Sequence, residues 1–153
     1  MNFRYFTIGE LTESATARRY NIKNIPGSSE LANLKALVEN LLDPLRELLG
    51  RPVFVSSGYR CRALNNKVGG SKTSQHMKGQ AADIYLKGLS NIVIAKVLVA
   101  SCLQWDQCII EKGSMQSPQW IHLSYKTSGN RNQILFYNGR SYVTVTKEQI
   151  KKA

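Results

Sequence analysis

With 153 residues, of which 42% are apolar and 20% charged, the chain has single-domain length and a globular rather than a disordered composition. It contains no apolar run behind a basic start near its beginning, and no stretch that approaches the roughly 20 apolar residues of a membrane span. We therefore expect a protein that is synthesised in the cytoplasm without a signal peptide and without a membrane span.

The net charge of +11 predicts attraction to an anionic partner. Nucleic acid, acidic lipid headgroups and the anionic polymers of a bacterial cell wall all fit this charge. The lysines and arginines are scattered along the chain, however, and form no arginine-rich arm or recognition helix that would point to nucleic acid.

The three cysteines, Cys61, Cys102 and Cys108, are odd in number and form no C-x-x-C pair. This count excludes a full disulfide framework and argues against a thiolate zinc site. We expect reduced cysteines that are mostly buried.

The first half of the chain is predicted to be largely helical. Leucines recur at intervals of three and four residues from Leu31 to Leu49, which is the pattern of a helix with one broad apolar face. Ser28 or Ser29 can cap its start and Gly50 ends it. Pro44 predicts a kink, or two helices placed end to end. A shorter helix, capped by residue 12 or 14, is expected to end at residue 19.

Short apolar and alternating runs predict the strands. An Asn138-Gly139 pair between two such runs suits a type I′ turn and indicates a hairpin. Ser90 can cap a helix whose apolar face includes Ile94, Leu98 and Cys102. The expected ranges are strand 52–56, a polar loop 58–80, strand 81–86, helix 90–103, strands 107–111 and 120–125, and a hairpin of 134–137 with 142–145.

Helical and strand patterns that occur in separate runs are typical of an α+β protein, with helices packed on a mainly antiparallel sheet. The chain has no internal repeat, low-complexity tract or linker. We therefore predict one domain over residues 1–153, and we expect a monomer.

The polar segment around His76 leads into a strand that starts with a carboxylate. Asp83 is followed by the apolar run Ile84-Tyr-Leu86, where an unpaired carboxylate is costly to bury and a bound cation would offset that cost. Gly79 and two alanines carry little side chain, so the backbone can turn closely and bring His76 and Asp83 to one point.

The second histidine lies in a strand with clear alternation. Trp120, His122 and Ser124 share one face, whereas Ile121 and Leu123 point to the other, which we expect to be the core. His122 is therefore predicted to face a cleft or solvent. Nothing in this local pattern alone requires a metal.

Three motifs, in this chain order, resemble the zinc D-alanyl-D-alanine carboxypeptidase family: Ser56-Ser-Gly-Tyr-Arg60, Ser74-x-His76-x-x-Gly79-x-Ala81-x-Asp83 and Trp120-x-His122. The similarity runs from about Phe6 to Tyr125 and includes Asp43-Pro44-Leu45-Arg46. That family includes bacterial and phage peptidoglycan peptidases, and the hedgehog signalling domain shares its fold. The resemblance therefore implies a hedgehog-like fold and a zinc-dependent peptidase.

The resemblance also implies roles for single residues. His76, Asp83 and His122 match the three zinc ligands, and a fourth position is left for water, as in catalytic rather than structural zinc sites. Arg60 matches the arginine that binds the substrate carbonyl or carboxylate and stabilises the oxyanion. Ser74 is a candidate substrate contact. A surface arginine paired with an acid is the alternative for Arg60.

The general base is less well defined by the resemblance. Many family members place a glutamate three residues before the last histidine ligand, where this chain has Gln119, which does not accept a proton at neutral pH. Other members, the hedgehog domain among them, carry the acid at the end of the preceding strand, where Glu111 lies. We therefore assign the base to Glu111, and a solvated glutamate at a strand end is the alternative.

The function that follows from the resemblance is hydrolysis of an amide bond in the peptide stem of bacterial peptidoglycan, by a carboxypeptidase or an endopeptidase. Anionic cell-wall polymers are the partners that the charge then favours. A phage or prophage endolysin, released to the wall through a membrane hole made by another protein, would explain the missing signal peptide.

Two other functions compete with this one. A zinc-containing peptidoglycan-binding module that has lost turnover is favoured by Gln119. A nuclease is favoured by charge alone; nucleases of the histidine-asparagine-histidine type need a compact ββα cluster, whereas the two histidines here are 46 residues apart (122 − 76). We therefore expect no nucleic-acid partner.

Overall fold

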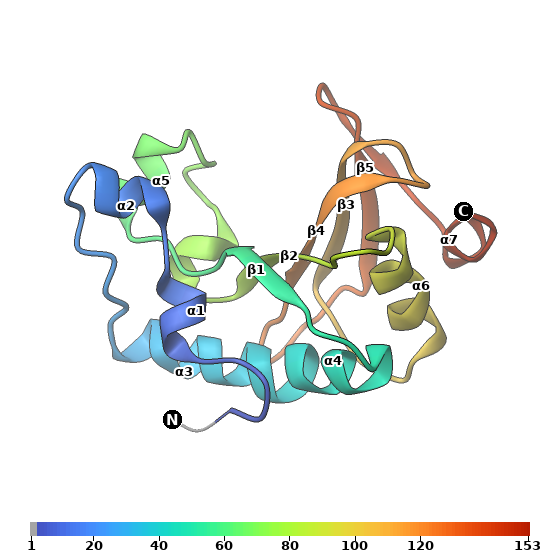
Figure 1. The fold of residues 1–153 in the computed structure, drawn as a ribbon, viewed down its shortest axis with the longest axis horizontal. Helices are drawn as coiled ribbons and strands as arrows, with labels where there is room; N and C mark the ends of the chain where they lie inside the picture. Colours follow the sequence, from blue (N-terminus) through green and yellow to red (C-terminus); the bar gives the residue numbers. More distant parts are fainter. Residues whose placement is uncertain (1–2) are drawn as a thin grey trace.

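The computed structural model describes residues 3–153, which form helices around a six-stranded sheet (Figure 1). The strands lie in the order β1-β2-β4-β3-β5-β6, and every neighbouring pair is antiparallel except β3 and β5. The predicted α+β fold with a mainly antiparallel sheet is therefore confirmed. The strands are β1 (Phe54–Ser57), β2 (Ala81–Tyr85), β3 (Gln107–Gly113), β4 (Pro118–Ser124), β5 (Gln133–Tyr137) and β6 (Tyr142–Thr144).

Helices cover one face of this sheet. Helix α6 contacts β3, β4 and α4, and α3 contacts η2, the short 3-10 turn that precedes β2. In Figure 1 the α3–α4 rod lies along one side of the molecule with α6 beside it. The helical segments are α1 (Ile8–Thr12), α2 (Ala15–Arg19), α3 (Ser28–Leu37), the π-helix η1 (Val38–Leu42), α4 (Asp43–Leu49), α5 (Arg62–Lys67), η2 (Gln75–Lys78), α6 (Ile92–Ala100) and α7 (Lys147–Lys152).

Alternation along β4 separates the core from the opposite face of the sheet. Ile121 and Leu123 are fully buried in the core with residues of α3, η1, α4 and α6, whereas His122 points away from them and keeps some exposure. This is the orientation that the sequence predicts. The face that carries His122 lines a cleft, described below.

The long leucine-rich helix consists of α3, η1 and α4, which follow one another without a gap, as in the predicted arrangement of helices placed end to end. A π-helical turn, η1, lies directly before the proline, and the Asp43 N–H bonds to the Val38 carbonyl in place of the usual α-helical partner. A π-turn changes the local hydrogen-bond pattern, and Pro44 stands in the first turn of α4, where its missing N–H is tolerated. The predicted serine cap is wrong: Ser28 already belongs to α3, and Gly27 is the N-cap without a side-chain bond.

The predicted polar loop 58–80 is wrong in part, because it contains α5 and η2. The predicted helix 90–103 is shorter than expected. It starts at Ile92 after the N-cap Asn91 and ends at Ala100, so Cys102 lies outside it. The hydroxyl of Ser90 nevertheless accepts a bond from the Ile92 N–H at 3.4 Å. The predicted cap of α2 by Ser14 is confirmed, since its side chain accepts from the Ala17 N–H.

The predicted hairpin forms from β5 and β6, but its turn is not type I′. Tyr137 pairs with Tyr142, so four residues connect the strands. The Asn138 side chain accepts bonds from the N–H groups of Arg140 and Ser141, and Gly139 alone in this loop has a positive φ. A type I′ turn requires positive φ at both central residues, which Asn138 does not adopt.

The cysteines are unpaired, as predicted, but only Cys108 is buried; Cys61 is half-buried and Cys102 is exposed. Burial raises the pKa of the Cys108 thiol to about 12, which keeps it protonated and inert. None of the helices within residues 3–153 is long and apolar enough to cross a membrane.

Candidate metal centre

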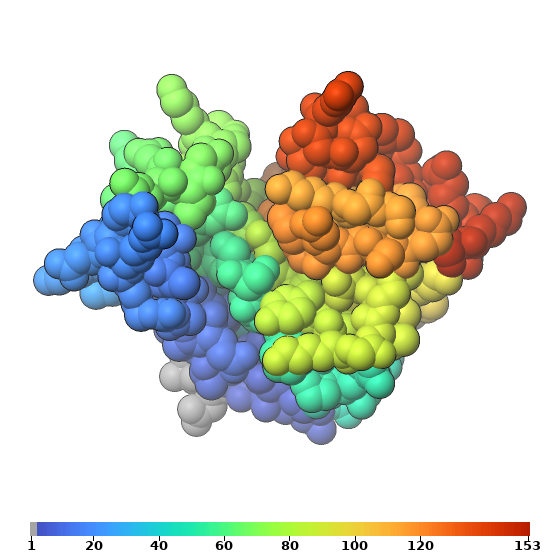
Figure 2. Space-filling view, turned by 45° about the horizontal axis from the view of Figure 1, so that its top comes forward, coloured from blue at the N-terminus to red at the C-terminus, as the bar shows by residue number. Residues whose placement is uncertain are grey.

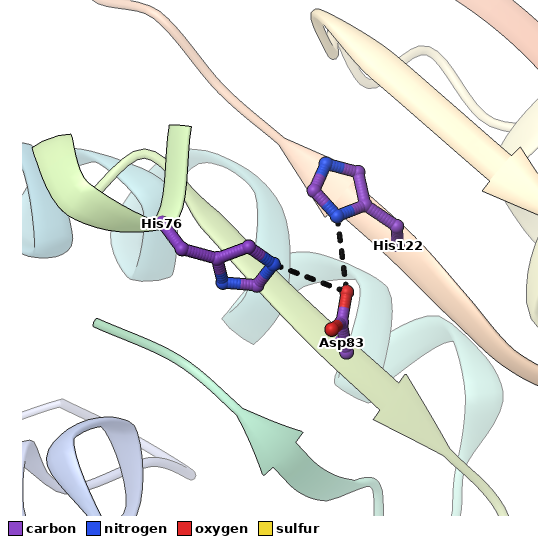
Figure 3. Close-up of side chains that lie close together, drawn as sticks. All are labelled: His76, Asp83 and His122. Carbon is purple, nitrogen blue, oxygen red and sulfur yellow. Dashed lines mark hydrogen bonds and ion pairs between the residues drawn. The ribbon is translucent and has the colours of Figure 1, made fainter. Parts of the chain in front are cut away.

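His76, Asp83 and His122 converge from three segments of the chain (Figure 3). His76 comes from η2, Asp83 from β2 and His122 from β4, where it pairs directly with Asp83 in the sheet register. Asp83 Oδ1 lies 3.3 Å from His76 Nε2 and 3.0 Å from His122 Nδ1. The sequence therefore predicted correctly which polar side chains meet.

The turn between η2 and β2 brings His76 back towards Asp83. The Ser74 hydroxyl caps η2 by accepting a bond from the His76 N–H at 3.2 Å. Gly79 then has φ +72°, and a Cβ at this position would lie 2.4 Å from the Glu30 carbonyl oxygen of α3. Only glycine fits both the conformation and the close approach, which explains its place between the two ligands.

The His76 ring is oriented by the backbone. Its Nδ1 lies 2.7 Å from the Gly58 carbonyl oxygen, so this nitrogen donates and Nε2 is left to face Asp83 and His122. A Cβ on Gly58 would lie 2.2 Å from the Leu11 carbonyl oxygen, which fixes glycine here too. Burial lowers the pKa of His76 and favours the neutral imidazole that a metal requires.

Asp83 is buried and ionised. Burial by itself would raise the pKa of Asp83, but the charge and hydrogen bonds of His76 and His122 outweigh it and hold this pKa below its ordinary value. A carboxylate and two imidazoles around one point form a donor set typical of zinc.

The spacing of these atoms fits a zinc ion. Bonds of about 2.0–2.2 Å in tetrahedral geometry place neighbouring ligand atoms about 3.4 Å apart. The two separations from Asp83 Oδ1 are 3.0 and 3.3 Å, and all three ligand atoms lie within 4.8 Å of one another. Within residues 3–153 three side chains offer ligand atoms to this site, and the site borders an open cleft. Three protein ligands with an accessible fourth position are expected for a catalytic rather than a structural zinc.

Arg60 lies beside the three side chains in a fixed position. Its Nε donates to Ser57 Oγ at 3.1 Å and its Nη1 to Asn65 Oδ1 at 2.9 Å, while Nη2 lies 3.8 Å from Asp83 Oδ2. Burial lowers the pKa of Arg60, and the nearby carboxylates of Asp83 and Glu111 oppose this shift. The guanidinium stays charged and is preorganised beside the metal centre.

Asn65 is a functional residue that the sequence did not reveal. It is fully buried, and its amide donates to the Ser71 carbonyl while its oxygen holds Arg60. Asn65 lies in the six-residue helix α5, after the Ser-Gly-Tyr-Arg motif, and a helix of this length is too short to show a hydrophobic periodicity in the sequence. A buried amide that joins a loop to an arginine becomes visible only in the folded chain.

Glu111 lines the same cleft as the metal centre. It pairs with Trp120 across β3 and β4, and Trp120 Nε1 donates to Glu111 Oε2 at 2.5 Å. Burial, together with the charge of Asp83, raises the pKa of Glu111. Gln119, in contrast, is exposed and does not line the cleft, because alternation along β4 turns it away from His122.

The cleft has a volume of about 570 Å³. Figure 2 shows the hollow between the green segment, which contains α5 and the loop after it, and the orange and red strands of the last third of the chain. Arg60, Ser74 and the three metal-centre residues lie in it, together with Glu111. Residues that sequence reasoning missed also line it: Lys78, Gln107, Lys126, Arg131 and Tyr142.

Comparison with known proteins agrees with this geometry. The sequence profile of the family described as Peptidase M15 matches residues 4–124, which is most of the chain and includes every residue of the metal centre. A comparison with curated protein sequences finds no match.

Proposed function

The chain belongs to the Peptidase M15 family, whose members are zinc peptidases, and we propose that it hydrolyses an amide bond in the peptide stem of bacterial peptidoglycan. The observation that carries this proposal is the convergence of His76, Asp83 and His122 in an open cleft, with Glu111 and Arg60 beside them. A metal with three protein ligands, a carboxylate of raised pKa and a fixed cation together form the parts of a metallohydrolase.

A zinc ion held by these residues would act as a Lewis acid. It would lower the pKa of a water molecule and so make that water a better nucleophile towards an amide near neutral pH. Glu111 accepts the proton of the attacking water and then delivers it to the leaving amine. Its Oε2 is occupied by Trp120 Nε1, so Oε1 is the atom for this transfer. The raised pKa of Glu111 brings it closer to the working pH, which favours both accepting and donating the proton.

Arg60 stabilises the negative charge that develops on the carbonyl oxygen. Its guanidinium is held by Ser57 and Asn65 before any substrate arrives, so little reorganisation is needed during the reaction. Ser74, whose hydroxyl oxygen accepts a bond from the His76 N–H, retains its own proton for a substrate contact.

The choice of peptidoglycan follows from the family and agrees with the net charge of +11, because cell-wall polymers are anionic. We place the activity at the cell wall, where this substrate occurs. Both a terminal and an internal amide are candidates for the bond that is cut, and a monomer is sufficient because one chain provides every residue of the centre.

Digestion of purified peptidoglycan tests the proposal. We expect the zinc-loaded protein to release new amino groups, a chelator to stop this release, and added zinc to restore it. Mass spectrometry of the fragments identifies the bond. Binding to peptidoglycan without any release of amino groups, in the presence of zinc, would contradict the proposal and support a binding module instead.

A further inference from the structure

The cleft extends beyond the metal centre in both directions along β3. Gln107, Ile109 and Glu111 all line it, and Ile109 pairs with His122, so the metal centre lies at the middle of this row. Gln107 and Glu111 are separated by about 13 Å of extended strand. Glu111 and Tyr142 border one end of the cleft, and Gln107, Lys126 and Arg131 border the other.

Basic side chains dominate the end near Gln107. Lys126 and Arg131 line the cleft there, and the carboxylate near them is that of Asp106, which is fully buried beneath the cleft surface. Two cations against one anion leave this end positive by one charge. Lys126 and Arg131 also lie beyond residue 124, where the match to the family ends.

The guanidinium of Arg131 is fixed by Asp106. Its Nε donates to Asp106 Oδ1 at 2.9 Å and its Nη2 to Oδ2 at 2.8 Å, and the Arg131 backbone N–H also donates to Oδ1. Its Nη1 takes no part in these bonds, and about half of the side chain is exposed. Arg131 therefore presents further donors to the cleft from a rigid position.

Lys126 is placed next to it by a separate set of bonds. Its backbone N–H donates to Asn130 Oδ1 at 2.8 Å, and its carbonyl accepts from Asn130 Nδ2 at 2.9 Å, so the turn does not depend on the lysine side chain. The ammonium lies 3.8 Å from Asp106 Oδ2 and is partly exposed. The cationic groups of Lys126 and Arg131 thus both lie near Oδ2 of one buried carboxylate.

We propose that Lys126 and Arg131 form a subsite that binds a free carboxylate of the peptide substrate, away from the amide that is cut. Lys126 lies four residues after His122 and two residues beyond the end of β4, so at most about 13 Å of chain separates them, which corresponds to at most about four residues of extended peptide. This inference rests on the proposed peptidase function and adds a substrate feature to it: an acidic residue some residues from the scissile bond.

Two stem peptides test the subsite. They differ in a single group within about four residues of the scissile bond, which is a carboxylate in one peptide and a carboxamide in the other. Binding to the zinc-loaded protein is measured by calorimetry, and kcat and KM are measured by amino-group release. We expect the carboxylate peptide to bind about tenfold more tightly than the amide, as for a hydrogen bond to a charged group. In Lys126→Ala this preference should fall severalfold, because only Arg131 remains in the subsite, with the KM for the carboxylate peptide raised and its kcat unchanged.

Two variants provide the controls. Lys126→Arg should restore the preference, because it keeps the charge on the same turn. Lys23→Ala removes the same charge from an exposed position that does not line the cleft, and it should behave as the wild type. The subsite is overturned if Lys126→Ala loses affinity equally for both peptides, if it loses none, or if the wild type does not distinguish them.

The two proposals fail in different ways. If the wild type binds the carboxylate peptide with the expected preference but cleaves neither peptide, the peptidase function is contradicted and the subsite stands. If the wild type cleaves both peptides at equal kcat/KM, the peptidase function stands and the subsite is wrong.

Discussion

Glu111 lies in the cleft and is not a fully solvated strand-end glutamate. Its side chain is half-buried, it lines the cleft that contains the metal centre, and Trp120 holds one of its oxygens. Gln119, the other position that the family resemblance offers for this role, is turned away from the cleft. The assignment of the base to Glu111 is a prediction that two experiments test.

Glu111→Gln is expected to retain zinc and to lose turnover, with kcat lowered about 10²- to 10⁴-fold, the usual contribution of a general base. The variant keeps the size of the side chain, so the metal centre should be undisturbed. Zinc per chain, measured by elemental analysis, and amino-group release provide the two readouts. Wild-type kcat in this variant would exclude Glu111 as the base.

The pH profile of kcat/KM tests the same residue independently. Glu111 must be ionised to accept a proton, and burial raises its pKa, so activity should rise with pH through a value above that of an ordinary glutamate. The Trp120 N–H lowers this pKa, so Trp120→Phe should move the acid limb to higher pH. An acid limb that is identical in Trp120→Phe and wild type would contradict this coupling.

Local patterns singled out two residues of the metal centre, because Asp83 stands in an apolar run and alternation along Trp120–Ser124 separates His122 from the core. Their role as metal ligands together with His76, and the roles of Arg60, Ser74 and Glu111, needed the family resemblance. The Gly58 carbonyl that orients His76 and the Asn65 side chain that holds Arg60 belong to chain segments that meet them only in the folded state.

At the scale of elements, the turn from η2 into β2 determines the position of His76. Gly79 combines φ +72° with a close approach to the Glu30 carbonyl, whereas Gly88 has φ +76° and no neighbouring atom within 4 Å of a built Cβ. A comparison of substitutions at Gly79 and Gly88 therefore separates the free-energy cost of the left-handed backbone conformation from that of the steric contact with the Glu30 carbonyl.

Gly88→Ala should lower the free energy of unfolding by about 1 kcal/mol, the cost of a left-handed conformation alone. Gly79→Ala should lower it by clearly more, since the Glu30 carbonyl must also move, and it should weaken zinc binding as η2 shifts from α3. Urea unfolding and a competitive zinc titration measure these effects. Equal losses of stability in the two variants would contradict the role of the close contact.

Long elements were predicted well, and short ones were not. Leucine spacing identified the α3–α4 rod, and alternation identified β4, because both run over several periods. Helices α5 and η2 have six and four residues, too few for a period to appear. Pro44 predicted a disturbance of this helix, and a π-turn lies directly before it, but no residue pattern distinguishes a π-turn from other disturbances.

At the scale of the whole molecule, Asp106 joins segments that are far apart in sequence. It accepts bonds from Arg131 before β5 and from Gln75 in η2, directly next to the metal-centre residue His76. Its own N–H donates to the Ser124 carbonyl at the end of β4. Both walls of the cleft are therefore connected through one buried carboxylate.

Asp106 should make stability depend on pH in acid. Burial opposes ionisation of Asp106, but its bonds from Arg131 and Gln75 outweigh burial and lower its pKa to about 2 from an ordinary 3.8. Because the folded-state pKa is the lower one, ionised Asp106 stabilises the fold above about pH 4, and this contribution is lost as pH falls through about 2.

Asp106→Asn should therefore lower the free energy of unfolding by about 2–3 kcal/mol at neutral pH, from a difference of nearly two pKa units at about 1.4 kcal/mol each. Its difference from the wild type should shrink below about pH 4. Urea unfolding of both proteins from pH 2 to 7 measures this. A difference that stays constant across that range would show that the ionised carboxylate is not its source.

The central claim is that His76, Asp83 and His122 hold one zinc ion on which turnover depends. The most direct measurement titrates zinc into metal-free wild type and His122→Ala, and follows bound zinc and peptide hydrolysis in the same samples. We predict that wild-type activity rises in proportion to zinc up to one ion per chain, and that His122→Ala binds far more weakly and stays inactive. Full zinc binding and full hydrolysis in His122→Ala would contradict the account.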